Sequence, residues 1–332
     1  MPHAPLVISL GDPCGTGPEL IAEAHRRLRH RPELAFAVIG DAQTLANAGT
    51  DISLISTPDH AVACFSNRLP VLDYPLSQPA ITGQPDQIHA PFITNWIRTG
   101  VDFCLSGAAR ALVTAPIAKS VLYGAGFNFP GHTEYLGDLT KTVTYAGTRG
   151  PVMMLAAKDL RVVLATIHIS LSEVTTHLSA EGLYSLARIT HEALKRDFGI
   201  ARPRLVMAGL NPHAGEDGNI GREEIDLLTP LITQLQNESI DIRGPFPADT
   251  LFHEEARQTY DAVLCLYHDQ GLIPLKTLDF WGGVNITLGL PIVRTSPDHG
   301  TGFSIAGKGI ARPDSLIAAI EAAHHISLNR VS

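Results

Sequence analysis

The chain has 332 residues, of which 45% are hydrophobic, and a formal net charge of −8 from 25 basic and 33 acidic residues. This length predicts two domains or one fold with two lobes, and the hydrophobic content excludes a disordered chain. The negative balance argues against broad binding to nucleic acid or to anionic membranes. Any anionic ligand must therefore be bound by local positive charge.

The cysteines and the N-terminal segment indicate a cellular setting. The four cysteines are scattered and include no CxxC pair, which favours a reducing compartment over a disulfide framework. The first residues lack the basic segment and the apolar run of a signal peptide, and no uncharged apolar stretch is long enough to span a bilayer. We expect a soluble cytoplasmic protein with no nucleic-acid or membrane partner.

Apolar, β-branched segments alternate with amphipathic segments along the chain. A strand at residues 5–10 precedes a helix at 18–30, and a strand at 34–40 precedes a helix that begins at Asp41. Further strands are predicted at 110–116, 151–157, 160–168, 203–210 and 260–268, with helices at 180–196 and 222–236. This alternation predicts an α/β fold with a largely parallel sheet covered on both faces. Because no helix fits between 151–157 and 160–168, at least one antiparallel pair is expected.

Three histidines each follow one of these predicted strands: His168, His213 and His268. The carboxyl ends of parallel strands face the crevice in which open α/β sheets bind ligands. Any one such histidine is explained by a hydrogen bond to the backbone, but three at matching positions favour a shared divalent metal. Three imidazoles leave a coordination position open, as in catalytic sites. Zn²⁺ fits this set, with Co²⁺ or Mg²⁺ as alternatives.

Acidic residues adjoin two of the histidines. Asp269 follows His268, and Glu216 and Asp217 follow His213. Carboxylates near metal-bound imidazoles commonly orient the rings. For Glu216 and Asp217, loop solvation or helix capping is the favoured interpretation.

Two glycine-rich segments have the composition of nucleotide-contacting loops. Residues 11–19 (GDPCGTGPE) follow a strand and open a helix, whose N-terminus attracts anions. The segment lacks the GxGxxG fingerprint, so a tight strand–helix turn explains it equally well. Residues 298–313 combine a histidine with two glycine clusters and precede a helix. An ordinary surface loop is the alternative there.

Several polar residues are candidates for binding an anionic substrate. His132 and Thr133 lie at a predicted helix start in the motif 130–135, where Thr133 could instead be an N-cap. Lys276 and Arg294 lie beside predicted strands, and Asn285 begins one. The two cations could hold a phosphate or a carboxylate, although each alone is explained as a surface charge.

The two glycine-rich segments resemble those of the isocitrate and isopropylmalate dehydrogenase superfamily, in which aspartates bind the metal. With PGHTE, GLNPHAGE, PADT, YHDQGL and RTSxDHGT, which lie in order between Gly11 and about Ala319, the chain resembles the 4-hydroxythreonine-4-phosphate dehydrogenase family of vitamin B6 (pyridoxine) biosynthesis. Cys14 and Thr16 depart from the alanine and isoleucine that are usual there.

The resemblance implies a two-lobed α/β/α sandwich with the active site in the cleft between the lobes. Lobe one would comprise residues 1–115 and 277–332, with the nucleotide loop, and lobe two residues 116–276, with the metal ligands and the dimer interface. The crossings are expected near Pro116 and Lys276. The family is homodimeric, with active sites at the subunit interface.

The resemblance also implies roles for individual residues. His168, His213 and His268 match the metal ligands. The residues that match the substrate-binding set are His132, Thr133, Lys276, Asn285 and Arg294. Contacts to NAD(P) are expected from Gly11, Asp12, His299, Gly300, Thr301, Ala306 and Gly307. The candidates for catalysis are Lys276, His132 and Asp249.

The implied reaction is oxidation of 4-phosphooxy-L-threonine by NAD(P) to 2-amino-3-oxo-4-(phosphooxy)butanoate, which decarboxylates to 3-amino-2-oxopropyl phosphate. One alternative is a paralogue that acts on D-threonate or D-erythronate 4-phosphate or on a dihydrodiol carboxylate. A more remote alternative is a phosphotransacetylase-like transferase, because fold does not fix function. The preference between NAD and NADP, the native metal and the subunit that supplies each ligand stay open.

Overall fold

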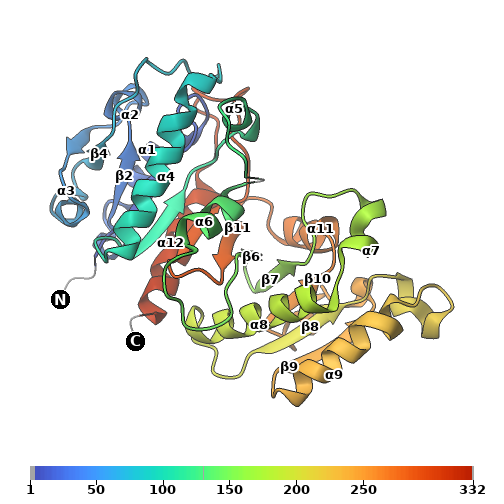
Figure 1. The fold of residues 1–332 in the computed structure, drawn as a ribbon. Coiled ribbons are helices and arrows are strands. Elements are labelled where there is room, and N and C mark those ends of the chain that lie inside the picture. Colours follow the sequence, from blue (N-terminus) through green and yellow to red (C-terminus); the bar gives the residue numbers. More distant parts are fainter. Residues whose placement is uncertain (1–3, 130, 331–332) are drawn as a thin grey trace. The chain divides into compact units, whose positions relative to one another are not determined.

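The computed structural model describes residues 4–129 and 131–330. The chain forms two compact units (Figure 1). Unit 1 comprises Met1–Thr144 and Leu290–Ser332, and unit 2 comprises Tyr145–Gly289. Unit 1 is therefore built from both ends of the chain, and unit 2 from its middle.

The unit boundaries lie further along the chain than the expected crossings at Pro116 and Lys276. Within the segment after Pro116, the Tyr135 hydroxyl donates to the Thr94 carbonyl of unit 1 at 3.3 Å. The segment after Lys276 continues into β11 (Val284–Leu288), which pairs with β6 (Val152–Ala157) of unit 2.

Unit 1 contains a parallel sheet in the order β3-β4-β2-β1-β5-β12. Its strands are β1 Leu6–Ser9, β2 Phe36–Gly40, β3 Ile52–Leu54, β4 Leu69–Asp73, β5 Ala111–Thr114 and β12 Arg294–Pro297. Every residue of β1, β2 and β5 is buried, which requires that both faces of the sheet be covered.

Helices supply that cover in unit 1. They are α1 Gly17–Leu28, α2 Ala42–Asn47, α3 Ala61–Cys64, α4 Ala90–Leu105, α5 Lys119–Gly124, α6 His132–Thr140 and α12 Asp314–Asn329. Helix α4 packs on β1, β2 and β5, whereas α12 packs on β5, β12 and α1 (Figure 1). Asp41 caps α2 by accepting from the Thr44 amide at 2.7 Å, as its position predicts.

Unit 2 contains a mixed sheet in the order β11-β6-β7-β10-β8-β9. The strands besides β6 and β11 are β7 Leu160–Leu164, β8 Arg204–Ala208, β9 Asp241–Phe246 and β10 Ala262–Cys265. Strands β7, β10, β8 and β9 are parallel, and β6 is antiparallel to both of its neighbours. The expected antiparallel pair of residues 151–157 with 160–168 is confirmed.

The helices of unit 2 are α7 Val174–His177, α8 Ala180–Arg196, α9 Thr229–Asn237, α10 Glu254–Arg257 and α11 His268–Leu278. Helix α8 has the predicted bounds, with Ser179 accepting from the Gly182 amide at 3.1 Å. The helix expected at 222–236 instead begins with a π-helical turn, η6 (Glu224–Leu228). Short turns η5 (Pro212–Gly218) and η7 (Ala248–Thr250) connect the strands.

The core of unit 2 lies under the strands that precede the three histidines. Val162, Val206 and Val263 come from β7, β8 and β10 and are each at most 1% exposed. Leu275 of α11 joins the same cluster. This packing fixes the strand ends relative to one another, because close-packed interiors tolerate little displacement.

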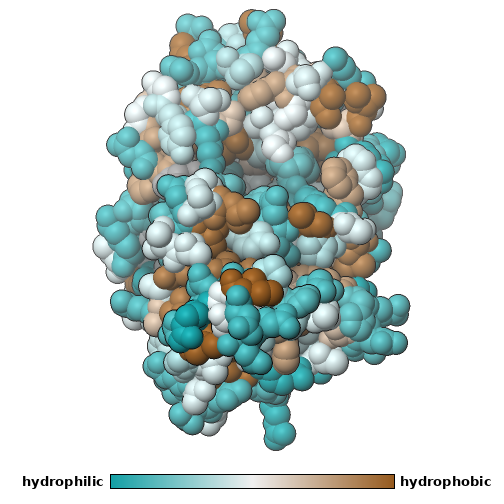
Figure 2. Space-filling view, turned by 90° about the vertical axis from the view of Figure 1, so that its right-hand side faces the viewer, coloured by the Kyte–Doolittle hydropathy of each residue, from teal (hydrophilic) through white to brown (hydrophobic). Residues whose placement is uncertain are grey.

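The molecular surface is predominantly polar, with scattered apolar residues on the face shown in Figure 2. Unit 2 exposes Ile273, Phe280 and Trp281 at 63%, 61% and 49%. Among the helices that the structure describes, none combines the length and the apolar character needed to cross a membrane.

Candidate functional site

Three adjacent parallel strands of unit 2 lead to the three histidines. His168 follows β7, His268 is the first residue of α11 after β10, and His213 lies on η5 after β8. Because β10 lies between β7 and β8, the three carboxyl ends share one edge of the sheet. The strand pattern in the sequence therefore places the three histidines after strands that end at one edge of the sheet.

His168 and His268 lie close enough to share a ligand. Their ring centroids are 5.8 Å apart, with an interplanar angle of 42°. With Zn–N distances of about 2.1 Å, the ring centres of two imidazoles on one ion lie roughly 5–6 Å apart. Asp269 Oδ1 lies 2.7 Å from His268 Nδ1, as expected for an orienting carboxylate, so Nε2 is the ring atom that would coordinate a metal.

His213 stands apart from this pair in its backbone and its exposure. Its side chain is 71% exposed, and the backbone has φ values of 52°, 51°, 83°, 45° and 52° from His213 to Asp217. This is a left-handed turn, which residues other than glycine rarely adopt. Across residues 4–129 and 131–330, no group of three or more histidine, cysteine or acidic side chains is arranged to hold a metal. The structure thus brings together two of the three predicted ligands.

The contact that Glu216 makes differs from the role that the sequence favours for it, which is loop solvation or helix capping. Its Oε2 lies 2.7 Å from His213 Nδ1, so the carboxylate orients the ring rather than only solvating the loop. The left-handed turn brings residue 216 back over residue 213. Sequence spacing could not show this contact, because the contact depends on a backbone conformation that the residue types disfavour.

Unit 1 holds a buried cation. Arg294, the first residue of β12, is 2% exposed, and its Nε and Nη2 donate to Thr114 Oγ1 at 3.2 and 2.6 Å. Burial lowers the pKa of Arg294 to about 9, and Glu134 opposes this shift. The guanidinium is therefore charged at neutral pH in a poorly hydrated setting, where an anion is strongly attracted.

His132 lies beside this cation. Burial, Arg294 and Lys119 together lower the pKa of His132 well below its ordinary value, so the imidazole is neutral at neutral pH. Its buried Nε2 has no hydrogen-bond partner among the described residues. A buried polar atom without a partner is costly, which suits a group that bonds to a ligand.

The surroundings of His132 exclude Thr133 as an N-cap and add Lys119 to the candidate site residues. Thr133 is buried, but Gly131 is the N-cap of α6, so Thr133 is not a cap; Pro130, which opens the motif, lies outside the described residues. A Cβ added at Gly131 would lie 3.8 Å from Lys119 Nζ, in ordinary van der Waals contact, so the lysine lies close to the glycine. Lys119 was missed in the sequence, although it follows β5 in the same way that the histidines follow their strands.

The remaining candidates for substrate binding and catalysis lie in unit 2. Asn285 belongs to β11, and its Oδ1 is buried with no hydrogen-bond partner in the described chain. Lys276 Nζ lies 5.5 Å from the ring centroid of Phe280. Asp249 lines a cavity of about 550 Å³ that Asp269 also lines. Asp249 thus shares a cavity with the carboxylate that orients His268.

The two glycine-rich segments meet in unit 1. The Thr16 amide and Oγ1 both donate to the Thr301 carbonyl, at 2.8 and 3.1 Å. Gly11 has φ +75°, and a Cβ there would lie 2.5 Å from the Pro116 carbonyl oxygen, so only glycine fits. Thr16, one of the two departures from the family pattern, therefore adds a side-chain bond between the segments.

Asp12 lies in this turn as a buried carboxyl group. It is 1% exposed, and its Oδ1 accepts from the Cys14 amide at 3.0 Å. Its Oδ2 is buried without a hydrogen-bond partner among the described residues. Burial raises the pKa of Asp12 to about 6, against the opposing effect of the Cys14 amide.

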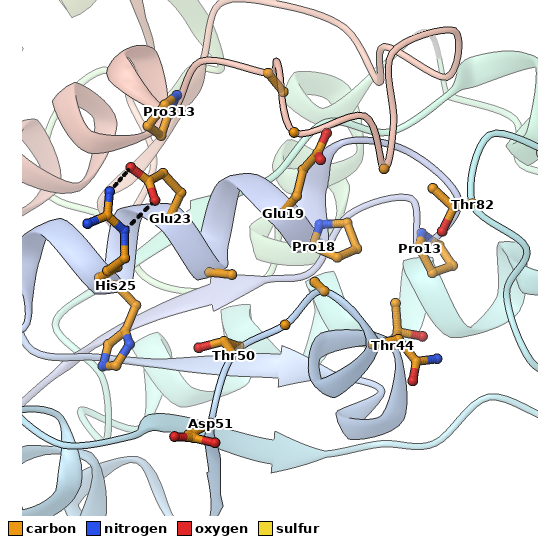
Figure 3. A pocket seen from close by; sticks show the side chains of 18 of the residues that line it. Pro13, Pro18, Glu19, Glu23, His25, Thr44, Thr50, Asp51, Thr82 and Pro313 are labelled. Carbon is orange, nitrogen blue, oxygen red and sulfur yellow. Dashed lines mark hydrogen bonds and ion pairs between the residues drawn. The ribbon is translucent and has the colours of Figure 1, made fainter.

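A cavity of about 700 Å³ lies along α1 (Figure 3). Its lining includes Gly15, Glu19 of α1 and Gly307 of the predicted nucleotide loop. Glu23 holds Arg26 at its edge through two hydrogen bonds of 2.7 and 2.6 Å. Ligand pockets commonly span about 300–1,000 Å³. The long wall formed by α1 was missed in the sequence, which pointed only to the turn before it.

The other predicted cofactor residues lie beside this cavity or in its loop. His299 Nδ1 is 3.0 Å from the Gly300 carbonyl, and Ala306 is buried. Gly307 has φ +72°. The predicted residues therefore belong to one structural region, although Gly307 is the one that lines the cavity.

The chain matches known proteins over nearly its whole length. The sequence profile of the pyridoxal phosphate biosynthetic protein PdxA family matches residues 33–323. A 4-hydroxythreonine-4-phosphate dehydrogenase of Caulobacter vibrioides is 58% identical, over 99% of each chain. The crystal structure of a protein of that name from Klebsiella pneumoniae has a TM-score of 0.84 and 36% identity, and the match covers 98% of this chain and 99% of the other.

A more distant structure shows the fold alone. A terephthalate 1,2-cis-dihydrodiol dehydrogenase from Burkholderia xenovorans has a TM-score of 0.65 at 24% identity, with 97% of this chain and 98% of the other covered. The α/β fold expected from the sequence is confirmed.

The buried carboxyl of Asp12 should make stability depend on pH. The unfolded side chain ionises near pH 4, and burial raises the folded pKa to about 6. A raised folded pKa means that stability is lost as pH rises between these values, by up to about 3 kcal/mol. Asp12→Asn keeps the oxygen that accepts from Cys14 and does not ionise.

Urea unfolding of Asp12→Asn and of the parent protein at pH 4 and pH 7 measures this effect. The variant should gain stability relative to the parent as pH rises, and exposed Asp51→Asn should not. If the free energies of unfolding of Asp12→Asn and of the parent protein differ by the same amount at pH 4 and pH 7, the Asp12 carboxyl is not desolvated.

Proposed function

Because the chain belongs to the pyridoxal phosphate biosynthetic protein PdxA family, we propose that it is a metal- and NAD(P)-dependent dehydrogenase that oxidises 4-phosphooxy-L-threonine. The observation that carries the proposal is the full-length match, at 58% identity, to a 4-hydroxythreonine-4-phosphate dehydrogenase. In the proposed reaction, C3 loses hydride to NAD(P)⁺ and its hydroxyl loses a proton. The resulting 2-amino-3-oxo-4-(phosphooxy)butanoate then loses CO2 and takes up a proton, which yields 3-amino-2-oxopropyl phosphate.

The histidines of unit 2 fit a divalent metal. His168 and His268 are separated as two ligands of one ion would be, and carboxylates at Nδ1 of His268 and His213 leave each Nε2 for coordination. Imidazole ligands favour Zn²⁺ or Co²⁺ over Mg²⁺. Bound there, such an ion would polarise the C3 hydroxyl and stabilise negative charge on its oxygen.

We propose that His213 completes the ligand set of a second copy in a homodimer. Its exposed side chain and its separation from the His168–His268 pair support this assignment. The same outward presentation would place the Glu216 carboxylate beside a neighbouring chain.

The phosphate or the carboxylate of the substrate would be bound by four residues of unit 1, which are Arg294, Lys119, His132 and Thr133. Arg294 supplies a buried charge, and the neutral His132 supplies a ring nitrogen that can donate or accept. Burial strengthens both interactions, because water competes weakly there. Asn285, whose amide oxygen is buried, and Lys276 are the further candidates for polar contacts to the substrate.

Proton transfer would fall to His132, Lys276 or Asp249. A neutral imidazole can accept a proton directly, and the depressed pKa of His132 keeps it in that form at neutral pH. Lys276 would act if it loses its proton on substrate binding. Asp249 would act through the cavity that it shares with Asp269.

The nicotinamide dinucleotide would bind in unit 1. The turn at residues 11–17 opens α1, whose N-terminus attracts phosphate, and Thr16 fixes the 299–309 loop against it. The adjoining cavity of about 700 Å³ has room for the adenosine portion. When bound, the nicotinamide ring supplies the hydride acceptor.

The direct test is NADH or NADPH formation with 4-phosphooxy-L-threonine. Activity should be abolished by a chelator and restored by Zn²⁺ or Co²⁺. D-Threonate 4-phosphate, which carries a hydroxyl in place of the amine, should react much more slowly, because a site built for one polar group leaves its partners unpaired with another. Faster turnover of D-threonate 4-phosphate than of 4-phosphooxy-L-threonine would identify a paralogue. If neither compound is oxidised, the assignment is refuted.

His213→Ala should bind metal at least tenfold more weakly than the parent protein and should lose activity. The control is His253→Ala, at an exposed histidine of unit 2, which should retain the metal affinity and the activity of the parent. Metal content and NADH formation measure these effects. A His213→Ala chain that retains both would exclude His213 as a ligand.

Mixing subunits tests whether the ligands come from two chains. His213→Ala and His268→Ala homodimers should both be inactive. If His213 serves the neighbouring subunit, random exchange should restore about a quarter of the activity, because half of the dimers are mixed and each has one intact site. No recovery in verified mixed dimers would place all three ligands in one chain.

Arg294→Lys should raise the KM for the phosphorylated substrate by about ten- to a hundredfold, because a lysine loses the two-donor contact to Thr114 and the planar geometry that anions match. Steady-state kinetics measure this, with Arg222→Lys, at an exposed ion pair, as the control. An unchanged KM would remove Arg294 from the binding site.

A further inference from the structure

A chain of buried hydrogen bonds links the three strand ends that carry the histidines. Thr166 Oγ1 donates to the Leu266 carbonyl, the Leu266 amide donates to Gln270 Oε1, and Gln270 Nε2 donates to the Gly209 carbonyl. Each of the three distances is 2.7 Å. The chain therefore runs from the end of β7 through the end of β10 to the end of β8.

Glu224 continues the chain on the β8 side. It is 3% exposed, and its Oε1 accepts from the amides of Leu210 and Asn211, both at 2.8 Å. Its Oε2 accepts from Asn211 Nδ2 at 2.9 Å. A Cβ added at Gly215 would lie 2.7 Å from the same carboxylate, so the left-handed turn packs directly on Glu224.

The bonds fix each loop close to its histidine. Thr166 lies two residues before His168, Leu266 lies two before His268, and Asn211 lies two before His213. The left-handed backbone at His213 is disfavoured for a residue with a Cβ, so the turn requires contacts outside itself. Glu224 supplies them from the following helical turn.

Gln270 has the chemistry that a link between two loops requires. Its amide accepts from a backbone N–H of the His268 loop and donates to a backbone carbonyl of the His213 loop. An ionised glutamate could only accept, and an apolar side chain would leave both backbone groups buried without these bonds. Gln270 is 7% exposed, so water cannot readily replace either bond.

We propose that Gln270, with Thr166 and Glu224, is a positioning network that holds the loops of His168, His213 and His268 in place and thereby sets the affinity and geometry of the metal sites to which these histidines contribute. The inference rests on the proposed metal-dependent function. It assigns to these residues no contact with metal or substrate. Their effect passes through the backbone of the histidine loops.

The test uses Co²⁺ alone as the probe, because its visible absorption reports coordination geometry. Gln270→Met keeps the volume and removes both bonds, and should weaken Co²⁺ binding by about tenfold or more and alter the spectrum. The matched control is Gln236→Met, since the exposed Gln236 also donates its Nε2 to a backbone carbonyl, that of Ile242, at 2.8 Å. The control should leave both readouts unchanged.

Hydrogen exchange in the metal-free protein separates this inference from the proposed function. In Gln270→Met the Leu266 amide should exchange at least tenfold faster than in the parent protein. In Glu224→Ala the same increase is expected for the amides of Leu210 and Asn211. If the parent protein binds no Co²⁺, the metal-dependent function fails and the positioning role, which rests on it, fails with it. If the parent binds Co²⁺ but the Leu266 amide of Gln270→Met exchanges at the parent rate, the positioning role alone is overturned. If Gln270→Met does not fold, Thr166→Val, which removes one hydroxyl, should still weaken Co²⁺ binding.

Parent-like Co²⁺ affinity and spectrum in a folded Gln270→Met or Thr166→Val protein would overturn the proposal. So would unchanged exchange of the Leu266 amide in folded Gln270→Met. A loss of thermal stability with an unchanged Co²⁺ spectrum would show that the network is only structural, and would equally overturn it.

Discussion

Parallel pairing of β7, β10 and β8 is the constraint on which the rest of unit 2 depends. Parallel neighbours end at the same edge of a sheet, so residues far apart in sequence arrive together without any contact between their own segments. His168 and His268 follow adjacent strands and become ring neighbours. The antiparallel β6 pairs with β7 on the side away from β10 and leaves this edge intact.

Unit 1 shows the energetic cost of preparing a site for charged ligands. Asp12 and Arg294 are buried, and His132 is partly exposed with a buried Nε2. Burial opposes the charged form of each. Apolar residues in their places would give a more stable unit, so their presence is better explained by binding than by folding. Asp12 and His132 each have a buried atom without a hydrogen-bond partner among the described residues. A ligand that forms a hydrogen bond to such an atom would reduce the cost of burying it.

The sequence predicts features that local chemistry determines and misses those that tertiary contacts create. Asp41 as a cap, the bounds of α8 and the antiparallel pair follow from residue types and spacing. Glu216 at His213 depends on a left-handed backbone that its residue types disfavour, whereas Lys119 beside Gly131 and Gln270 between two strand ends depend on how segments meet. The pairing of β11 with β6 likewise depends on a partner strand that the pattern of β11 does not identify.

The outward presentation of His213 has a thermodynamic consequence if it serves a neighbouring chain. A metal held by ligands from two subunits binds the dimer more tightly than the monomer, so metal stabilises the dimer by mass action. The coupling is reciprocal, and dimer formation raises metal affinity by the same factor. The backbone contacts from Glu224 to Leu210 and Asn211 then matter to assembly as well as to coordination, because a His213 loop held in one conformation loses less entropy on reaching its partner.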